Sequence, residues 1–417
     1  MMIKPTTKFN WEFIALLWFA FFFNQADRQL FNIALPAVRA DLGLSDAQLG
    51  LIASAFILAI GLFVPVAGYV GDKFSKKSVI MLSVLIWSAA TFITGFSGGF
   101  LVLIILRSLV GGSEAFYAPA ANALIAEKFK LNLGYAMAIH QTALYAGIIG
   151  SGIIGGYITE HHGWRTAFFI FGIIGILLFV IMFFRLEDGR VSKSRRDVSM
   201  LDGIKKLSAN KTALFLTASF TCMVFVNVGY LTWTPTFLHE KFGLSLTEAG
   251  FSSMFYHHAF AFAGVMIGGK LSDRLAVRNA NSRLQIQAWA LLLGAPFIGL
   301  MGMATSLPAV YIALSVFGLF RGMYDSNIYA SLYSVIDERN RASVSAAMIM
   351  CAYVVGSLAP TILGYFKPIV GLTDGLASLS LFYILGGTLI FIALKATFQN
   401  DRTALLQNLT HHDESQQ

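Results

Sequence analysis

Apolar stretches of about twenty residues or more recur from one end of the chain to the other. A helix needs about 20 apolar residues to cross the hydrocarbon core of a bilayer. Only 12% of the residues are charged and 56% are hydrophobic, whereas a soluble domain is about 25% charged. The sequence therefore predicts an all-α integral membrane protein with twelve transmembrane helices, at 12–34, 46–70, 78–96, 100–126, 134–158, 165–185, 212–238, 247–270, 285–305, 308–335, 342–366 and 376–397.

Lys and Arg residues are divided unequally between the two sides of this arrangement. With both termini in the cytoplasm, 23 of the 30 fall in cytoplasmic segments, four fall on the other side, and three lie inside predicted helices. Basic residues favour the cytoplasmic side, so we expect cytoplasmic termini and a multi-pass protein of the cell inner membrane. The net charge of +8 is thus an orientation signal. We expect contact with lipid and no binding of nucleic acid.

A polar stretch at 187–211 separates six predicted helices from the next six. We expect an N-terminal six-helix bundle over 1–186, a cytoplasmic linker over 187–211, a C-terminal six-helix bundle over 212–398 and a disordered tail over 399–417. Within the linker, 198–207 has the pattern of an amphipathic surface helix.

The two halves repeat a short charged motif. Asp72 and Lys73 follow the second predicted helix, and Asp273 and Arg274 follow the eighth. Such repetition indicates an internal duplication, and therefore two pseudo-symmetric bundles. We expect these residues to brace the outward-open state by contacting helix ends of the opposite bundle.

Charged residues also occur inside apolar stretches. Asp27 and Arg28 lie in the first predicted helix, and Arg107 and Glu114 lie seven residues apart, hence on one face, in the fourth. A charge at membrane depth costs at least a few kcal/mol, so it is retained mainly where it faces a polar cavity. A fixed structural ion pair is the alternative for each of them.

The run from Gly68 to Lys77, Gly-Tyr-Val-Gly-Asp-Lys-Phe-Ser-Lys-Lys, resembles a loop motif of the major facilitator superfamily, with Ser75 where Gly is usual. The run from Arg107 to Ala115 is similar to that family's motif in its fourth helix. The resemblance covers essentially the whole chain. It implies two six-helix bundles that expose a central site alternately to each side.

Asp27-Arg28 together with Arg107 and Glu114 looks like the anion:cation symporters, which include hexuronate, galactonate and sialic-acid-type carriers. By this resemblance, Arg28 grips the substrate carboxylate, Glu114 carries the coupling proton, and Asp27 and Arg107 couple protonation to gating. The same pattern also resembles the Spinster-like carriers of lysolipid-type amphiphiles.

The chemistry of these side chains fits such roles. A guanidinium stays charged and can hold a carboxylate through two hydrogen bonds. A substrate anion that competes for Arg28 would weaken the hold of that cation on Glu114 and let the carboxyl keep a proton. We expect no resident cofactor, only a proton gradient, although Na⁺ remains open as the coupling ion.

Other polar residues inside predicted helices are candidates for the cavity wall. Arg321 and Asp325, four residues apart, share a helix face and form either a gating pair or a structural one. Candidate substrate contacts are Tyr117, His140, Gln141, Tyr145, Asn327, Tyr329 and Tyr353. Further polar or aromatic candidates, for which packing is the plainer interpretation, are Asn227, Tyr230, Thr232, Trp233, His257 and His258.

The sequence thus predicts a monomeric, proton-coupled symporter that imports an organic anion such as a sugar acid. The alternatives are a Spinster-like amphiphile transporter and a membrane receptor without transport, while a drug exporter fits three cavity arginines less well. No P-loop, catalytic triad or metal-ligand spacing occurs, so we expect neither an enzyme nor a metal site. Cys222 and Cys351 lie in apolar stretches, as packing residues do.

Overall fold

The computed structural model describes residues 9–189 and 200–414, without the side chains of Asp72 and of 408–414. All regular secondary structure in these ranges is helical. The N-terminal half comprises α1 Trp11–Leu42, α2 Asp46–Lys73, α3 Lys76–Thr94, α4 Phe100–Glu114, α5 Tyr117–Lys128, α6 Leu133–Gly150, the π-helical turn η1 Ser151–Gly155, α7 Gly156–His162 and α8 Trp164–Arg185. The C-terminal half comprises α10 Lys211–Phe242, α11 Leu246–Ala276, α12 Ser282–Met303, α13 Leu307–Asp325, α14 Ile328–Tyr333, the short 3₁₀ turn η2 Glu338–Asn340, α15 Arg341–Gly356 and α16 Leu358–Ala396.

Each predicted stretch is helical, but three helices are divided differently from the prediction. The predicted helix 100–126 breaks between α4 and α5, and 308–335 breaks between α13 and α14. The predicted helix 342–366 breaks between α15 and α16. The turn expected between 366 and 376 was correct, because the chain turns within α16 at Gly371, whose φ of 73° suits glycine. The break after Glu114 and the break after Asp325 matter for the site.

Nine helical runs in the described part of the chain are long and apolar enough to cross a membrane. The twelve predicted stretches reduce to nine because 342–366 and 376–397 fall in one continuous run, and because α1 and α11 are absent from the set. The central part of α1, Asn24–Asn32, carries six polar or charged side chains, which lower its mean hydropathy. The same residues prove to face the interior of the protein.

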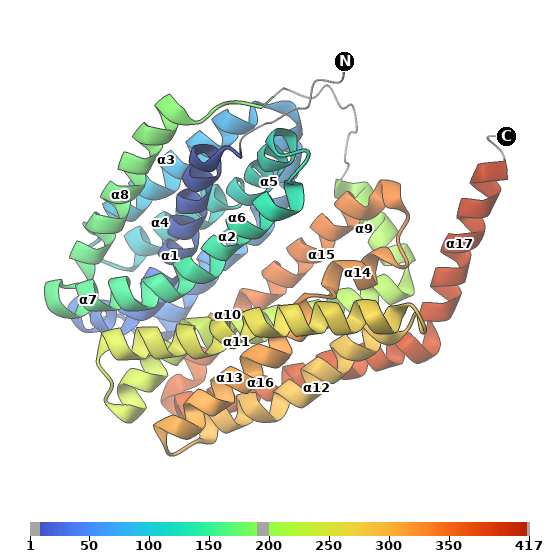
Figure 1. Cartoon of the computed structure of the whole chain (residues 1–417). Coiled ribbons are helices and arrows are strands. Elements are labelled where there is room, and N and C mark those ends of the chain that lie inside the picture. The colour runs from blue at the N-terminus through green and yellow to red at the C-terminus, as the bar shows by residue number, and fades with distance from the viewer. Residues whose placement is uncertain (1–8, 190–199, 415–417) are drawn as a thin grey trace.

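The two halves meet at one end of the molecule, which we call the closed end (Figure 1). There η1 and α7 of the N-terminal half pack against α11, and α2 packs against α16. At the opposite end, where α9 and α17 lie, the ribbons of the two halves stand farther apart (Figure 1).

Glycine allows backbones of the two halves to approach closely at the closed end. A Cβ atom on Gly50 of α2 would lie 2.3 Å from the carbonyl oxygen of Pro360, and one on Gly152 of η1 would lie 2.6 Å from that of Gly250. Either contact is too short for a side chain to be added without backbone movement. Small residues let membrane helices approach closely, and here they do so at contacts between the halves.

Four charged side chains close a ring between the halves, which we call the closed-end ring. Arg39 and Asp46 belong to the N-terminal half, and Glu240 and Lys367 to the C-terminal half. Arg39 binds Asp46 at 3.1 Å and Glu240 at 2.7 Å. Lys367 binds Asp46 at 3.0 Å and Glu240 at 2.9 Å. Two of the four ion pairs therefore cross from one half to the other.

Two segments outside the bundles also form helices. The predicted surface helix is present as α9 Met200–Ala209, and residues 198–199 lie outside the described residues. The expectation of a disordered tail was wrong, because α17 continues from Phe398 to Glu414. Its first turn is fixed to the bundle, since Asp401 accepts a hydrogen bond from the backbone N–H of Thr212 at 2.8 Å and Gln399 donates to Asn281 at 2.8 Å.

The repeated loop motif makes contacts within its own half. The side chain of Asp72 lies outside the described part of the structure, and Lys73 contacts the hydroxyl group and ring of Tyr69. Asp273 pairs with Arg283 of α12 at 3.0 Å. Bracing of a different conformational state by Asp72, Lys73, Asp273 and Arg274 therefore stays a prediction.

Ser75, the departure from the family's usual glycine, has a definite structural role. Its hydroxyl group accepts from the N–H of Ser78, which caps α3, and donates to Asp188 at 2.6 Å. Burial alone would raise the pKa of Asp188, but hydrogen bonds from Ser75 and from the backbone of Lys77 and Gly189 outweigh it and hold the pKa below its ordinary value. The serine thus ties the start of α3 to the chain that follows α8.

Loss of one cation from the closed-end ring should loosen the contact between the halves. Lys367→Met removes two ion pairs, one of which crosses the interface, so we expect a shift of about 1 kcal/mol, or roughly fivefold, toward separation. Spin labels at Ala40 and Asp374, both exposed, in protein lacking Cys222 and Cys351 would report the distance. Arg165→Met, which breaks the pair with Asp41 inside one half, is the control and should leave the distance distribution unchanged.

Candidate functional site

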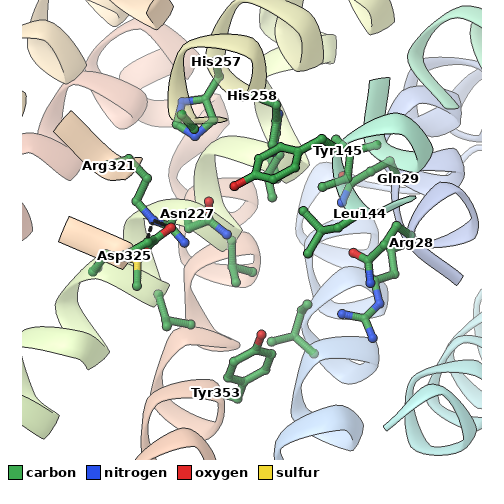
Figure 2. A pocket seen from close by; sticks show the side chains of 18 of the residues that line it. Arg28, Gln29, Leu144, Tyr145, Asn227, His257, His258, Arg321, Asp325 and Tyr353 are labelled. Atoms are coloured by element: carbon green, nitrogen blue, oxygen red, sulfur yellow. Dashed lines mark hydrogen bonds and ion pairs between the residues drawn. The ribbon is translucent and has the colours of Figure 1, made fainter. Parts of the chain in front are cut away.

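A cavity of about 620 Å³ lies between the two halves. This volume falls in the range typical of small-molecule sites. The residues that line it from the N-terminal half are Phe21, Gln25, Arg28, Gln29, Asn32, Ala53, Phe56, Ile57, Arg107, Ala118, Gln141, Leu144, Tyr145 and Ile148. Those from the C-terminal half are Phe220, Met223, Val224, Asn227, Val228, Leu231, Thr232, His257, His258, Ala261, Arg321, Asp325, Ile328, Tyr329 and Tyr353. Figure 2 shows part of this wall.

One face of α1 supplies the polar floor of the N-terminal side. Gln25, Arg28, Gln29 and Asn32 all line the cavity, and their spacing of three and four residues places them on one side of a helix. The sequence analysis identified Arg28 but missed Gln25, Gln29 and Asn32. The i, i+3, i+4, i+7 pattern around the arginine is the signal that would have found them.

Arg28 lines the cavity and also contacts a buried acid. Its Nε atom donates to Oε2 of Glu114 at 2.7 Å. The Arg28 side chain is 20% exposed, whereas that of Glu114 is 0% exposed. The prediction that both groups share the cavity holds for Arg28 alone, because Glu114 lies behind it and communicates with the cavity through the guanidinium group.

A helix break places Glu114 there. Glu114 is the last residue of α4, and α5 begins three residues later at Tyr117. The end of α4 is held tightly against α2, since a Cβ atom on Gly111 would lie 2.2 Å from the carbonyl oxygen of Phe56. The backbone that carries Glu114 is therefore held close to α2.

Asp27 and Arg107 form a second, deeper layer. Asp27 is buried and accepts a hydrogen bond from Thr91 of α3. Arg107 lines the cavity with its guanidinium 4.3 Å from the ring centre of Phe56. Arg107 interacts electrostatically with both Asp27 and Glu114. Two arginines and two acids thus form one coupled charge cluster in the N-terminal half.

Hydrogen-bonding capacity is left over in this cluster. Among the residues that the structure describes, buried atoms without a hydrogen-bond partner include Oδ1 of Asp27, Nε and Nη1 of Arg107, and Oε1 of Glu114. Most buried polar atoms in proteins are paired, so such exceptions call for a functional or structural reason.

Across the cavity, the C-terminal half presents the predicted pair on α13. Nε of Arg321 lies 2.8 Å from each carboxylate oxygen of Asp325, and both residues line the cavity. Figure 2 shows them on the opposite side from Arg28, with Tyr145 and Asn227 between. The pairing is intrahelical, as predicted.

Four of the predicted substrate contacts besides Arg28 also reach the cavity. Gln141 and Tyr145 share a face of α6, and Tyr329 and Tyr353 enter from α14 and α15. Of the weaker candidates, Asn227, Thr232, His257 and His258 line the cavity as well. Tyr230 and Trp233 do not, because the hydroxyl of Tyr230 donates to Ser253 at 2.6 Å and the indole of Trp233 to Pro360 at 3.0 Å within the C-terminal core.

Three predicted substrate contacts were wrong as to position. Tyr117 donates to the carbonyl oxygen of Leu17 at 2.5 Å, and His140 is stacked on Phe21 with ring centres 4.7 Å apart. Both are fully buried and absent from the cavity wall. Asn327 is also fully buried, and its amide donates to the carbonyl oxygen of Met323 at 3.2 Å. It occupies the break between α13 and α14, where helical periodicity gives no guide to side-chain direction.

Within 9–189 and 200–414, no group of three or more His, Cys, Asp and Glu side chains has a metal-binding arrangement.

The fold and the cavity between two helical halves define a multi-pass membrane protein of the transporter class. The family model of the Major Facilitator Superfamily matches residues 17–360, and the chain belongs to that family, whose members are transporters.

Known relatives refine the comparison. The chain is 26% identical over 401 residues to the hexuronate transporter of Bacillus subtilis, covering 91% of this chain and 92% of that protein. It is 26% identical over 426 residues to a probable sulfoacetate transporter, SauU, of Cupriavidus necator, covering 95% of each.

A solved structure gives the same fold. The crystal structure of a bacterial homologue of the human lysosomal transporter Spinster, in an inward-facing and unoccupied conformation, superimposes with a TM-score of 0.81 at 20% identity and covers 94% of this chain and 98% of that one.

Neighbouring residues of the wall and the core should respond differently to substitution. Tyr117→Phe removes a buried hydrogen bond and should lower stability by about 1 kcal/mol without changing ligand affinity. Gln141→Ala, at a position that lines the cavity, should weaken ligand binding and leave the melting temperature unchanged. Thermal unfolding of both purified variants, with and without a sugar acid, separates the two effects. Weaker ligand binding in Tyr117→Phe with an unchanged melting temperature would instead place Tyr117 in the binding site.

Proposed function

We propose that this protein is a proton-coupled symporter that imports an organic anion, most closely a sugar acid of the hexuronate, aldonate or sialic acid type, by alternating access. The observation that carries the proposal is the contact between Arg28, which faces the cavity, and Glu114, which does not. The similarity to transporters of hexuronate and sulfoacetate supports an anionic substrate.

The mechanism is a competition for one guanidinium group. With the cavity empty, Arg28 neutralises Glu114, since a buried carboxylate without a partner is strongly disfavoured. A substrate carboxylate that binds the exposed edge of Arg28 weakens this pairing. Glu114 then takes up a proton and becomes a neutral carboxyl group, so that no buried carboxylate is left without a partner. Substrate and proton therefore load together, and loss of one favours release of the other.

Arg107 and Asp27 also affect the protonation equilibrium of Glu114. Arg107 is electrostatically coupled to both acids, and Asp27 is tied to α3 through Thr91. A change in the charge of Glu114 therefore alters the electrostatic interactions that connect α1, α3 and α4. We assign Asp27 and Arg107 to the step that links protonation to movement of the halves, with Arg321 and Asp325 as their counterpart in the C-terminal half.

The orientation follows from the basic residues. With twelve crossings, six in each half, and both termini in the cytoplasm, the closed-end ring faces outward, and this structure corresponds to a state that is closed to the outside. The similarity to an inward-facing structure supports this assignment. A cell inner membrane location, a monomeric state and energisation by a proton gradient rather than Na⁺ belong to the same proposal.

A Spinster-like amphiphile carrier is the second candidate. The apolar part of the wall favours it, with Phe21, Ile57, Leu144, Ile148 and Met223 among the lining residues. Thermal-shift measurements against sugar acids and lysolipids distinguish the two candidates, because a ligand that binds the folded state raises its melting temperature.

Removal of the proton carrier should uncouple transport without abolishing binding. Glu114→Gln should lose accumulation of a sugar acid in vesicles under an imposed proton gradient, yet retain exchange of labelled for unlabelled substrate. Glu127→Gln is the matched control, because it also removes an acid from an ion pair of the same half, with Lys76 at 2.6 Å, away from the cavity. Proton-driven accumulation that persists in Glu114→Gln would refute the coupling role.

Removal of the anchor should act on binding itself. Arg28→Gln deletes a charge-assisted contact and leaves Glu114 without its partner, so we expect at least a roughly tenfold loss of affinity for a sugar acid, in line with about 1.5–3 kcal/mol for a hydrogen bond to a charged group. Isothermal titration of the purified protein measures the change. An unaltered affinity would place the carboxylate elsewhere.

A further inference from the structure

The C-terminal wall holds an arginine whose hydrogen-bonding capacity is only partly used. Arg321 binds Asp325 through Nε alone. Its Nη1 atom is buried and has no hydrogen-bond partner among the described residues. The side chain is only 14% exposed and lines the cavity. A guanidinium group has five N–H donors, so Arg321, which lines the cavity, keeps donors beyond the one that binds Asp325.

The two halves present this chemistry in a related way. Glu114 is the last residue of α4, and Asp325 is the last residue of α13. Each acid precedes a short break in its helix and pairs with an arginine that lines the cavity, namely Arg28 and Arg321. Figure 2 places these two arginines on opposite sides of the cavity. A pair with a purely structural role has no need of an arginine that lines the cavity and keeps unused donors.

The surroundings of Arg321 and Asp325 suit an anionic group better than a cation. The titratable groups that interact electrostatically with this pair are Tyr145 of α6, Tyr230 of α10, His257 and His258 of α11, Tyr324 of α13, Tyr329 of α14 and Tyr383 of α16. Phenol and imidazole groups can donate hydrogen bonds to an acid. Asp325 is the only carboxylate among the described residues that line the cavity.

We propose that Arg321 is a second anion anchor, and that the cavity selects acids with an acidic group at each end, dicarboxylates or carboxylate–sulfonates, over acids of the same length with one. The proposal rests on the proposed function, because the first acidic group occupies Arg28. The substrate then bridges the halves: one end binds α1 of the N-terminal half and the other binds α13 of the C-terminal half. The negative charge of Asp325 repels the second acidic group of the substrate, so loss of the charge on Asp325 strengthens binding.

Two six-carbon sugar acids test the proposal directly. Galactarate and galactonate share a carbon chain and differ only at one end, where galactarate has a second carboxylate and galactonate a hydroxymethyl group. Isothermal titration of the purified full-length protein should show galactarate binding at least roughly tenfold more tightly than galactonate, the range expected for one charge-assisted contact.

Substitutions at the second anchor should remove this preference in binding. Arg321→Gln combined with Asp325→Asn leaves no buried unpaired charge, which protects folding. In this variant the galactarate affinity should fall to that of galactonate. Asp325→Asn alone is the control of opposite sign and should preserve or increase the preference. Arg28→Gln should weaken both ligands.

The outcomes distinguish a failure of the second anchor from a failure of the proposed function. If both acids bind but with equal affinity, or if the double variant retains the preference, the second anchor is refuted while the proposed function stands. If neither acid binds and a lysolipid does, the proposed function fails, and the second anchor fails with it. A preference for galactarate that disappears only when Arg321 and Asp325 are replaced supports both.

Discussion

The ion pair between Arg28 and Glu114 is the interaction on which the rest of the site depends. A carboxylate removed from water requires a partner, because the free energy of desolvation in a buried site exceeds several kcal/mol per ion. The backbone fixes Glu114 at the end of α4, pressed against α2 at Gly111, so the flexible partner is Arg28. In the proposed mechanism, a ligand on the cavity side of Arg28 therefore changes the protonation state of Glu114, a residue that the ligand does not touch.

The closed-end ring lets the halves separate without leaving a charge alone. Arg39 and Asp46 lie in one half and Glu240 and Lys367 in the other, and each half has its own internal pair besides the two pairs that cross. When the halves part, both internal pairs can persist, so opening sacrifices two contacts rather than four. Partly exposed pairs contribute modestly, which suits an interface that must form and break in every cycle. The glycine contacts at Gly50 and Gly152 make the same interface close-fitting without adding attraction.

Much of this arrangement was predictable from the sequence, and the failures have physical causes. Charges and apolar length can be read directly from the sequence, so the helical stretches and the cavity positions of Arg28, Arg321 and Asp325 followed from them. The family followed from the resemblance of the loop and fourth-helix motifs. The direction of a side chain near a helix break is different. The breaks after Glu114 and Asp325 interrupt the 3.6-residue period, and the positions of Tyr117 and Asn327 were therefore wrong. His140 lies on an unbroken helix, but a buried histidine stacked on Phe21 cannot be told from a cavity histidine without knowledge of the facing helix. The tail helix α17 was missed because its sequence is polar, and the contacts that hold its first turn, to Thr212 and Asn281, come from residues far away in the sequence.

Infrared difference spectroscopy of the protein in bilayers tests the central claim most directly. Addition of a sugar acid at neutral pH should produce the carbonyl band of a newly protonated carboxyl group, because the substrate displaces Glu114 from Arg28 and remains ionised itself. The band should be absent from Glu114→Gln, which still binds the substrate. Substrate binding without such a band, or a band of undiminished size in Glu114→Gln, would contradict the competition for Arg28.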